Sequence, residues 1–244
     1  MGETKEKSLQ HVQLPNDMTG TGELDPKDLL VYVCIKKYMN RETKECYPSL
    51  DTIVEISGVS KPTVRKSIER LKEKGYLEVR RVGRGNVYKF NSYKNFEPFS
   101  YAFLDKKDLT PNEKAYIIAT QQYMFKDIEG EGKLTYSDAE LGERINLSYN
   151  SIVKYNKSLK EKGYLDIIRT AKRDVETGVL VQEKMFHLTK LEQAIVFALQ
   201  NHEERIEDTE KKVRILEKQM QILLRENRDL KEKKIEEEVG GIML

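Results

Sequence analysis

The stretch PSLDTIVEISGVSKPTVRKSIERLKEKGYLEVRR, residues 48–81, predicts two helices joined by a tight turn and followed by a strand. Ser49 is a favoured N-cap for a short helix whose apolar residues lie within 53–56. Gly58 suits the left-handed backbone of a turn, because glycine has no Cβ to clash there. Ser60 is a second favoured N-cap and marks the start of the next helix.

The second of these helices carries one apolar stripe. Val64, Ile68 and Leu71 recur at the spacing of a single helical face. Pro62 lies in the first turn, where its missing N–H does little harm, and Gly75 ends the helix as a C′ residue does. We therefore expect a helix with one buried face and one exposed face.

Strand signals follow this helix. Apolar residues within 76–82 predict a strand, the sequence GRGN at 83–86 predicts a tight turn, and VYKF at 87–90 predicts a returning strand. The preceding segment 25–39 supplies another helix. Three helices followed by a β-hairpin are the element order of a winged helix-turn-helix.

The same pattern occurs a second time. EKGYL stands at 73–77 and again at 161–165, 88 positions later. At this offset the turn glycine becomes Asn146, which also tolerates the left-handed conformation, and the N-cap serine is kept as Ser148. The first helix repeats with an offset of 85. Chance would not preserve the turn, the cap and the apolar stripe together, so we interpret the chain as one structural unit used twice.

The second copy departs from the first in two places. Asn156 takes the position that Ile68 holds in the apolar stripe, so we expect Tyr155 to pack there instead. The second hairpin, 165–188, is longer, and its tip is expected near 174–178.

These patterns predict a mainly α fold with small β-hairpins (α+β), built from two tandem winged helix-turn-helix domains followed by a coiled coil. The predicted segments are a disordered N-terminal arm at 1–23, a first winged helix at 24–98, a second winged helix at 99–190, a coiled coil at 191–238 and a tail at 239–244.

The first unit resembles the winged helix of GntR-type bacterial regulators. The matching residues are Pro48-Ser49, Gly58-Val59-Ser60-Lys61, Thr63-Val64-Arg65 and Arg81-Val82-Gly83-Arg84-Gly85. The unit is also similar to winged-helix modules of phage and plasmid replication proteins from low-GC Gram-positive bacteria. The tandem arrangement looks like that of plasmid replication initiators. The resemblance implies a DNA-binding domain whose wing tip, Arg84 and Gly85, approaches the minor groove or the DNA backbone.

Charge is unevenly distributed, although the net charge is only +2. Residues 57–94 hold 11 Lys/Arg and 3 Asp/Glu, whereas 99–190 hold 15 and 14, and 191–244 hold 10 and 13. A locally basic segment in a neutral chain indicates a face directed at a polyanion. A solvated charged surface is the alternative interpretation.

In a winged helix the second helix of the turn enters the major groove of DNA. Arg65 is the best candidate for reading a base, because a guanidinium can bind guanine O6 and N7 together. Lys61 and Lys66 are expected to meet phosphates. The predicted DNA-contacting residues of the first winged helix are Lys61, Thr63, Arg65, Lys66, Arg70, Arg84 and Gly85.

The second winged helix offers an equivalent exposed face and a long wing. Its predicted DNA-contacting residues are Tyr149, Asn150, Lys154, Lys157, Lys172 and Arg173. The balanced charge of this segment leaves a second interpretation open, in which the domain binds protein or dimerises.

A heptad pattern follows from residue 191, without Gly or Pro before Gly240. A heptad sustained over this length favours a coiled coil, and Asn227 at an a position favours two strands in register. Pairs such as Lys212–Glu217 attract in a parallel arrangement, so we predict a parallel homodimer. A single helix folding back on the wings is the alternative. The predicted dimerisation residues are Ile206, Val213, Leu216, Met220, Leu223, Asn227 and Leu230.

The sequence contains no P-loop, no Cys/His cluster with metal spacing and no nucleophile–His arrangement. We therefore expect no enzyme, no cofactor and no metal. The N-terminus has no apolar stretch of the secretory kind, and the longest apolar run, at 29–35, is too short to span a bilayer. Cys34 and Cys46 are interpreted as reduced thiols, with Cys34 in the core. These features predict a cytoplasmic protein on the nucleoid or on plasmid or phage DNA.

Two functional classes remain open. The protein either initiates plasmid or phage replication at origin repeats, or regulates transcription as a dimer that covers an operator. A structural or partition role, in which the protein bridges DNA, is a third reading. The predicted partners are double-stranded DNA, a second copy of the chain, and a replication or transcription protein bound through the second winged helix or the tail.

Overall fold

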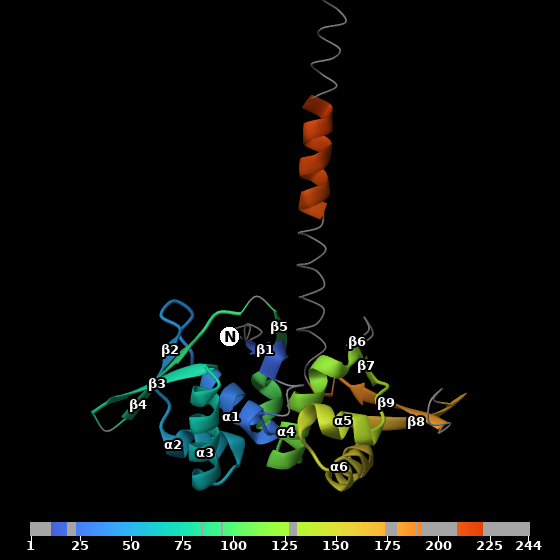
Figure 1. The fold of residues 1–244 in the computed structure, drawn as a ribbon, viewed down its shortest axis with the longest axis horizontal. Helices are drawn as coiled ribbons and strands as arrows, with labels where there is room; N and C mark the ends of the chain where they lie inside the picture. Colours follow the sequence, from blue (N-terminus) through green and yellow to red (C-terminus); the bar gives the residue numbers. More distant parts are fainter. Residues whose placement is uncertain are drawn as a thin grey trace, which may run out of the picture. The chain divides into compact units, whose positions relative to one another are not determined.

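A computed structural model describes residues 11–18, 23–83, 85–93, 95–126, 131–173, 180–188, 190–191 and 209–221 (Figure 1). The first repeat, residues 24–98, has the predicted order of three helices and a hairpin. Its helices and hairpin strands are α1 (Pro26–Lys36), α2 (Leu50–Ser57), α3 (Lys61–Glu73), β3 (Leu77–Val82) and β4 (Gly85–Phe90).

The second repeat, residues 99–191, has the same element order. Its α4 begins 85 residues after α1, and its α5 and α6 begin 88 residues after α2 and α3, as the two sequence offsets predict. The elements are α4 (Pro111–Thr120), β6 (Phe125–Lys126), β7 (Glu131–Leu134), α5 (Asp138–Ile145), α6 (Tyr149–Glu161), β8 (Leu165–Arg173) and β9 (Leu180–His187).

Each repeat ends in an antiparallel sheet that contains its hairpin. In the first repeat the short strand β2 (Glu45–Cys46) pairs with β4, which gives the order β2-β4-β3. In the second the order is β6-β7-β9-β8. Strands β8 and β9 have 9 and 8 residues against 6 each for β3 and β4, so the second hairpin is longer, as predicted.

The N-terminal segment differs from the prediction. The sequence was expected to be disordered over 1–23, and this is wrong for residues 11–18. Strand β1 (His11–Pro15) pairs antiparallel with β5 (Phe96–Ser100), and a 3-10 turn, Asn16–Met18, follows it. Val12 and Leu14 alternate along β1 and are both buried, so the strand is held by apolar contact as well as by its ladder.

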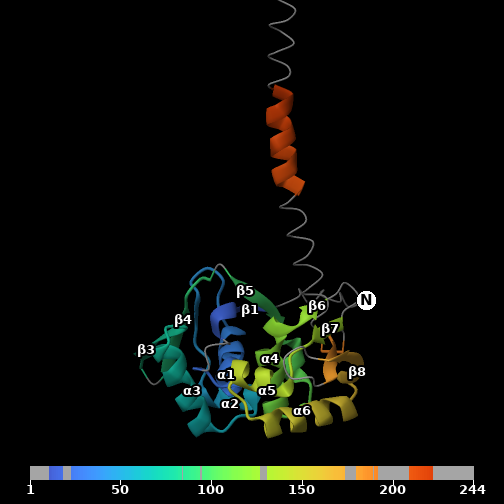
Figure 2. The same cartoon turned by 45° about the vertical axis from the view of Figure 1, so that its right-hand side comes forward.

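Helices α1 and α4 form the centre of the body (Figure 2). Both are buried over most of their length, because α1 packs on α2, α3 and α4, while α4 also contacts α5 and α6. The buried apolar side chains of the two repeats belong to one continuous cluster. The two repeats therefore share one core.

The chain forms two bodies, Met1–Ala198 and Leu199–Leu244. In the first, α3 and α6 lie toward one end, and β1 and β5 lie toward the opposite end (Figures 1 and 2). In the second, a helix is described over 209–221.

No described helix combines the length and the apolar character that crossing a membrane requires. Cys34 and Cys46 are free and buried, which confirms that Cys34 belongs to the core.

Candidate nucleic-acid interface

The turn between α2 and α3 has the predicted geometry. Ser49 caps α2, and its side chain accepts a hydrogen bond from the Thr52 backbone N–H at 3.0 Å. Gly58 ends α2 in the left-handed conformation with φ 67°. Ser60 is the N-cap residue of α3, although its hydroxyl bonds to the Thr63 hydroxyl at 2.8 Å and not to a backbone N–H. These residues end α2, form the turn and begin α3.

Helix α3 buries one face and exposes the other. Val64, Ile68 and Leu71 are buried, as the stripe predicts, and Ser67 joins them. Arg65 lies on the exposed face. The helix can therefore lay its exposed side in a groove of DNA without disturbing the core.

The cations on this exposed face differ in their partners. Lys61 pairs with Asp51 at the start of α2, with 2.6 Å between Nζ and the carboxylate oxygen. Arg65 and Lys66 are exposed, and neither makes an ion pair with any residue in the described part of the chain. Their charges are therefore the most available for DNA. Thr63, also predicted to contact DNA, is half-buried.

Arg70 is a correction to the sequence prediction. It was expected to face DNA or solvent, but its Nη2 lies 2.6 Å from Asp28 and 3.6 Å from Asp25. The Asp28 side chain is fully buried at the start of α1, so Arg70 is needed there to balance a buried carboxylate. Arg70 therefore links α3 to α1 through its ion pairs with Asp25 and Asp28.

The wing is the β3–β4 hairpin, which turns at Gly83 with φ 57°. Gly85 is exposed at the start of β4, and Arg84 lies outside the described residues. Arg80 is exposed and donates two bonds of 3.1 Å to Glu45. Arg81 is exposed beside the turn. Its place two residues before the turn glycine Gly83 is the sequence signal that Arg81 belongs to the wing.

The second repeat presents a different surface at the equivalent positions. Tyr149, Asn150, Lys154 and Lys157 are all exposed on α6, as predicted. The residue equivalent to Arg65 is Val153, which is 40% exposed, and Tyr149 one turn before it is 58% exposed. The side chains of Lys172 and Arg173 lie outside the described residues. Tyr149 and Val153 therefore stand on the exposed face of α6 at the positions where α3 carries Lys61 and Arg65.

Asn156 is a second correction. We expected Tyr155 to replace it in the apolar stripe, but Asn156 is itself buried. Its carbonyl oxygen accepts a bond from the Tyr116 hydroxyl at 2.7 Å, and its amide donates to Asp138 at 3.0 Å. Both partners come from other helices, so the polar side chain is satisfied inside the core. Tyr155 packs beside it against the Tyr116 ring.

The helix over 209–221 contains Val213, Leu216 and Met220, three of the predicted dimerisation residues. Their side chains are 46%, 62% and 57% exposed in the single chain. The predicted positions Ile206, Leu223, Asn227 and Leu230 lie outside the described residues.

A family model described as a helix-turn-helix domain matches residues 22–77. The matched segment contains α1, α2 and α3 and ends where β3 begins. No curated protein matches the chain. The match and the turn geometry together define the first repeat as a helix-turn-helix domain of the DNA-binding class. The match supports DNA as the partner of this repeat.

Proposed function

We propose that the protein binds double-stranded DNA sequence-specifically through two tandem winged helices and initiates plasmid or phage replication at origin repeats. The observation that carries the proposal is the position of α3 and α6, which lie toward the same end of one body (Figures 1 and 2). With both helices directed at one duplex, a single chain would cover a longer site than one helix-turn-helix can.

Differences between the two helices favour an asymmetric site. Arg65 on α3 can bind a guanine edge, whereas its equivalent on α6 is Val153, which can only make apolar contacts such as that with a thymine methyl group. One chain would then read a non-palindromic sequence. Repeated asymmetric sites in one orientation are suited to an origin, and that is why initiation is preferred here.

The alternative is a dimeric transcriptional repressor, and it rests on the helix over 209–221. Its Val213, Leu216 and Met220 follow the a, d, a spacing of a heptad and are exposed in the single chain. A parallel coiled coil would cover these residues and give the two-fold symmetry that a palindromic operator requires. The same dimer would serve a DNA-bridging protein, which is the third possibility. In each case the protein acts by binding, without a catalytic step.

Footprinting of the full-length protein on its native locus tests the proposal. Direct repeats beside an AT-rich stretch would be protected if the protein is an initiator. Protection of a palindrome over a promoter would favour the repressor instead. If no site is protected more strongly than random duplex at the same salt concentration, sequence-specific binding itself is wrong. Arg65→Ala, run in parallel, shows whether any protection depends on α3.

A further inference from the structure

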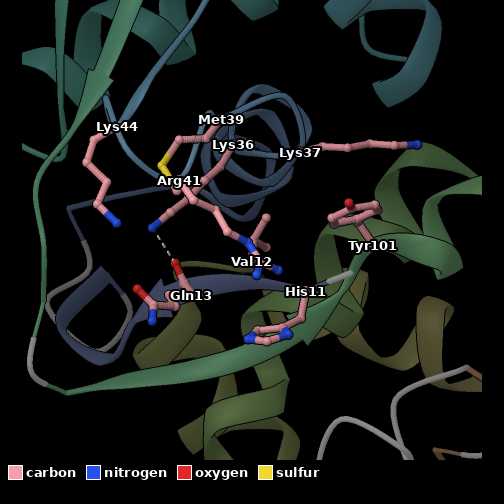
Figure 3. A pocket seen from close by; sticks show the side chains of 9 residues that line it. All are labelled: His11, Val12, Gln13, Lys36, Lys37, Met39, Arg41, Lys44 and Tyr101. Carbon is pink, nitrogen blue, oxygen red and sulfur yellow. Dashed lines mark hydrogen bonds between the residues drawn. The ribbon is translucent and has the colours of Figure 1, made fainter. Parts of the chain in front are cut away.

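A basic cavity of about 440 Å³ lies at the C-terminal end of α1, between that helix, the loop that follows it and β1 (Figure 3). Its lining includes His11, Lys36, Lys37, Arg41 and Lys44, and no Asp or Glu is among the lining residues. The nearby strand β1 lies at the end of the body opposite α3 and α6, so the cavity is separate from the proposed DNA face.

Lys36 is the buried cation of this cavity. Its side chain comes from the last turn of α1, and the residue is only 4% exposed. Nζ donates to the Gln13 carbonyl at 2.6 Å and to the Tyr32 hydroxyl at 2.8 Å, and both acceptors are neutral. An ammonium has three donors, so these two bonds leave one. Burial, with a smaller effect of the Lys44 charge, lowers the pKa of Lys36 to about 8. A bound anion would favour the charged ammonium and so oppose this shift.

Lys44 is held in a strained backbone conformation beside Lys36. Its φ is 59°, in the left-handed region that a lysine rarely adopts. The loop imposes this conformation, because Asn40 accepts bonds from the backbone N–H groups of Glu42, Thr43 and Lys44. Figure 3 shows the Lys44 side chain directed toward the same region as the Lys36 ammonium. Strain of this kind persists where the surrounding structure enforces it, and such positions concentrate at functional sites.

The remaining cations are unequally neutralised. Lys37 lies 3.7 Å from Asp105 and over the Tyr101 ring, on the other side of the cavity from Lys44. Within the described ranges, Arg41 and Lys44 make no ion pair with a carboxylate. The side of the cavity formed by Lys36, Arg41 and Lys44 therefore carries positive charge that the described residues do not balance.

We propose that this cavity binds a small phosphate-bearing molecule, with its phosphate on Lys36, Arg41 and Lys44. A phosphate has the charge and the number of acceptor oxygens for three cations, and an arginine fork can bind two of its oxygens at once. The volume lies in the range of small-molecule sites and exceeds what a single phosphate fills, which leaves room for an organic group beside Tyr101.

Binding there would act on the junction of the two repeats. The Lys36–Gln13 bond joins α1 to β1, and β1 pairs with β5, the strand that leads from the first repeat into the second. Helix α1 also packs on both α3 and α4. A ligand that binds only the folded protein stabilises it by mass action, so phosphate should raise the unfolding temperature.

The test is thermal unfolding of the full-length protein in inorganic phosphate and in AMP, each against chloride at matched ionic strength and pH. We expect a saturable rise in Tm with both probes and tighter apparent binding of AMP. Arg41→Gln and Lys44→Gln should each weaken the apparent affinity about tenfold, since each removes a charge-assisted bond. Lys107→Gln, which removes an exposed lysine outside the cavity, should leave it unchanged.

Two results would overturn the proposal. If phosphate does not raise the Tm of the wild type, the cavity does not bind phosphate. The same conclusion follows if phosphate raises the Tm of Arg41→Gln and of Lys44→Gln as much as it raises that of the wild type. If these two variants instead lose affinity for random duplex DNA and show a shallower salt dependence than Lys107→Gln, the phosphate comes from the DNA backbone and the small-molecule assignment is wrong. Arg41 is exposed and Lys44 half-buried, and circular dichroism confirms folding before either comparison.

Discussion

A buried carboxylate at the third position of the first helix recurs in both repeats. Asp28 accepts the Asp25 backbone N–H at 2.9 Å and pairs with Arg70 of α3. In the second repeat Glu113 accepts the Thr110 N–H at 2.7 Å and pairs with Lys162 at the end of α6. Burial alone would raise the pKa of Glu113, but the bonds from Lys162, Ser158 and Thr110 outweigh it and hold the pKa below its usual value. In each repeat, one carboxylate therefore caps the first helix and also anchors the third helix, α3 or α6, by an ion pair.

Removing Arg70 from α3 should lower stability, whereas removing Arg65 should lower DNA specificity. Arg70→Ala leaves the buried Asp28 carboxylate without its cation and should cost about 1–3 kcal/mol of unfolding free energy in urea denaturation. Arg65→Ala should leave stability within about 0.5 kcal/mol but reduce discrimination between specific and random duplex by about 1–3 kcal/mol. Full specificity in the Arg65 variant at fixed salt would refute the proposed docking of α3.

The buried thiol of Cys34 should make the folded protein less stable at alkaline pH. Burial raises the pKa of its thiol from 9.0 to about 12 in the folded protein. The unfolded chain loses this proton first, so the contribution is complete below pH 9 and is lost as the pH rises toward 12. Between pH 7.5 and 10.5, wild type should lose about 1–2 kcal/mol more than Cys34→Ala in urea unfolding. The other titrating groups are present in both proteins, so the difference between the two curves reports Cys34 together with Tyr38 and Lys114, whose pKa values its charge shifts. Equal losses would mean that the thiol is accessible.

At the scale of elements, local chemistry was predictable from the sequence and long-range contact was not. The positive φ at Gly58 and Asn146 follows from residue type at a turn, and so do the N-cap positions Ser49 and Ser148. Strand β1 was missed because its partner β5 is more than 80 residues away. The helical spacing of α3 predicts an exposed Arg70, because the buried Asp28 that faces it lies 42 residues earlier in the chain, at the start of α1.

Gly142 should tolerate no side chain in the second helix-turn-helix. A Cβ at this position in α5 would lie 2.5 Å from the Leu147 carbonyl oxygen, which is backbone and cannot rotate away. Gly142→Ala should therefore force α5 and the turn apart and cost about 1–3 kcal/mol in denaturant unfolding. The matched control is Gly85→Ala, whose Cβ would meet only Val82 O at an ordinary 3.9 Å. Equal stability of the two variants would show that the turn can open without cost.

The lysines of α3 should differ in their effect on salt dependence. Lys66→Ala should weaken binding to all sequences alike and lower the slope of log K against log salt by about one phosphate contact. Lys61→Ala should change the slope less, because Asp51 already neutralises Lys61 in the free protein. Fluorescence anisotropy with random duplex over a range of salt concentrations measures both. If Lys61→Ala lowers this slope more than Lys66→Ala does, the Lys61–Asp51 ion pair opens when the protein binds DNA.

On the scale of the whole molecule, the repeats are joined by more than their linker. Helix α1 packs on α4, and a Cβ at Gly58 would lie 2.7 Å from the Pro111 ring, so the turn of the first repeat touches the first residue of α4. With β1 paired to β5 and one continuous core, we expect the two repeats to unfold together in a single transition. Their recognition helices would then act on DNA as one rigid pair.

Truncation after residue 198 tests whether the second body links two such pairs. The remaining residues form a body of their own, so the shortened chain should fold and give a monomer by light scattering. It should bind a single site but lose the avidity of two linked modules, a factor of about 10²–10⁴. In the full chain, Val213→Glu with Leu216→Glu places charge on the predicted seam and should also give a monomer, whereas Lys218→Glu at an outer f position should not. A dimer that survives truncation would place dimerisation in the first body. A monomeric full-length protein at micromolar concentration would remove the coiled coil, and with it the symmetry on which the repressor alternative depends.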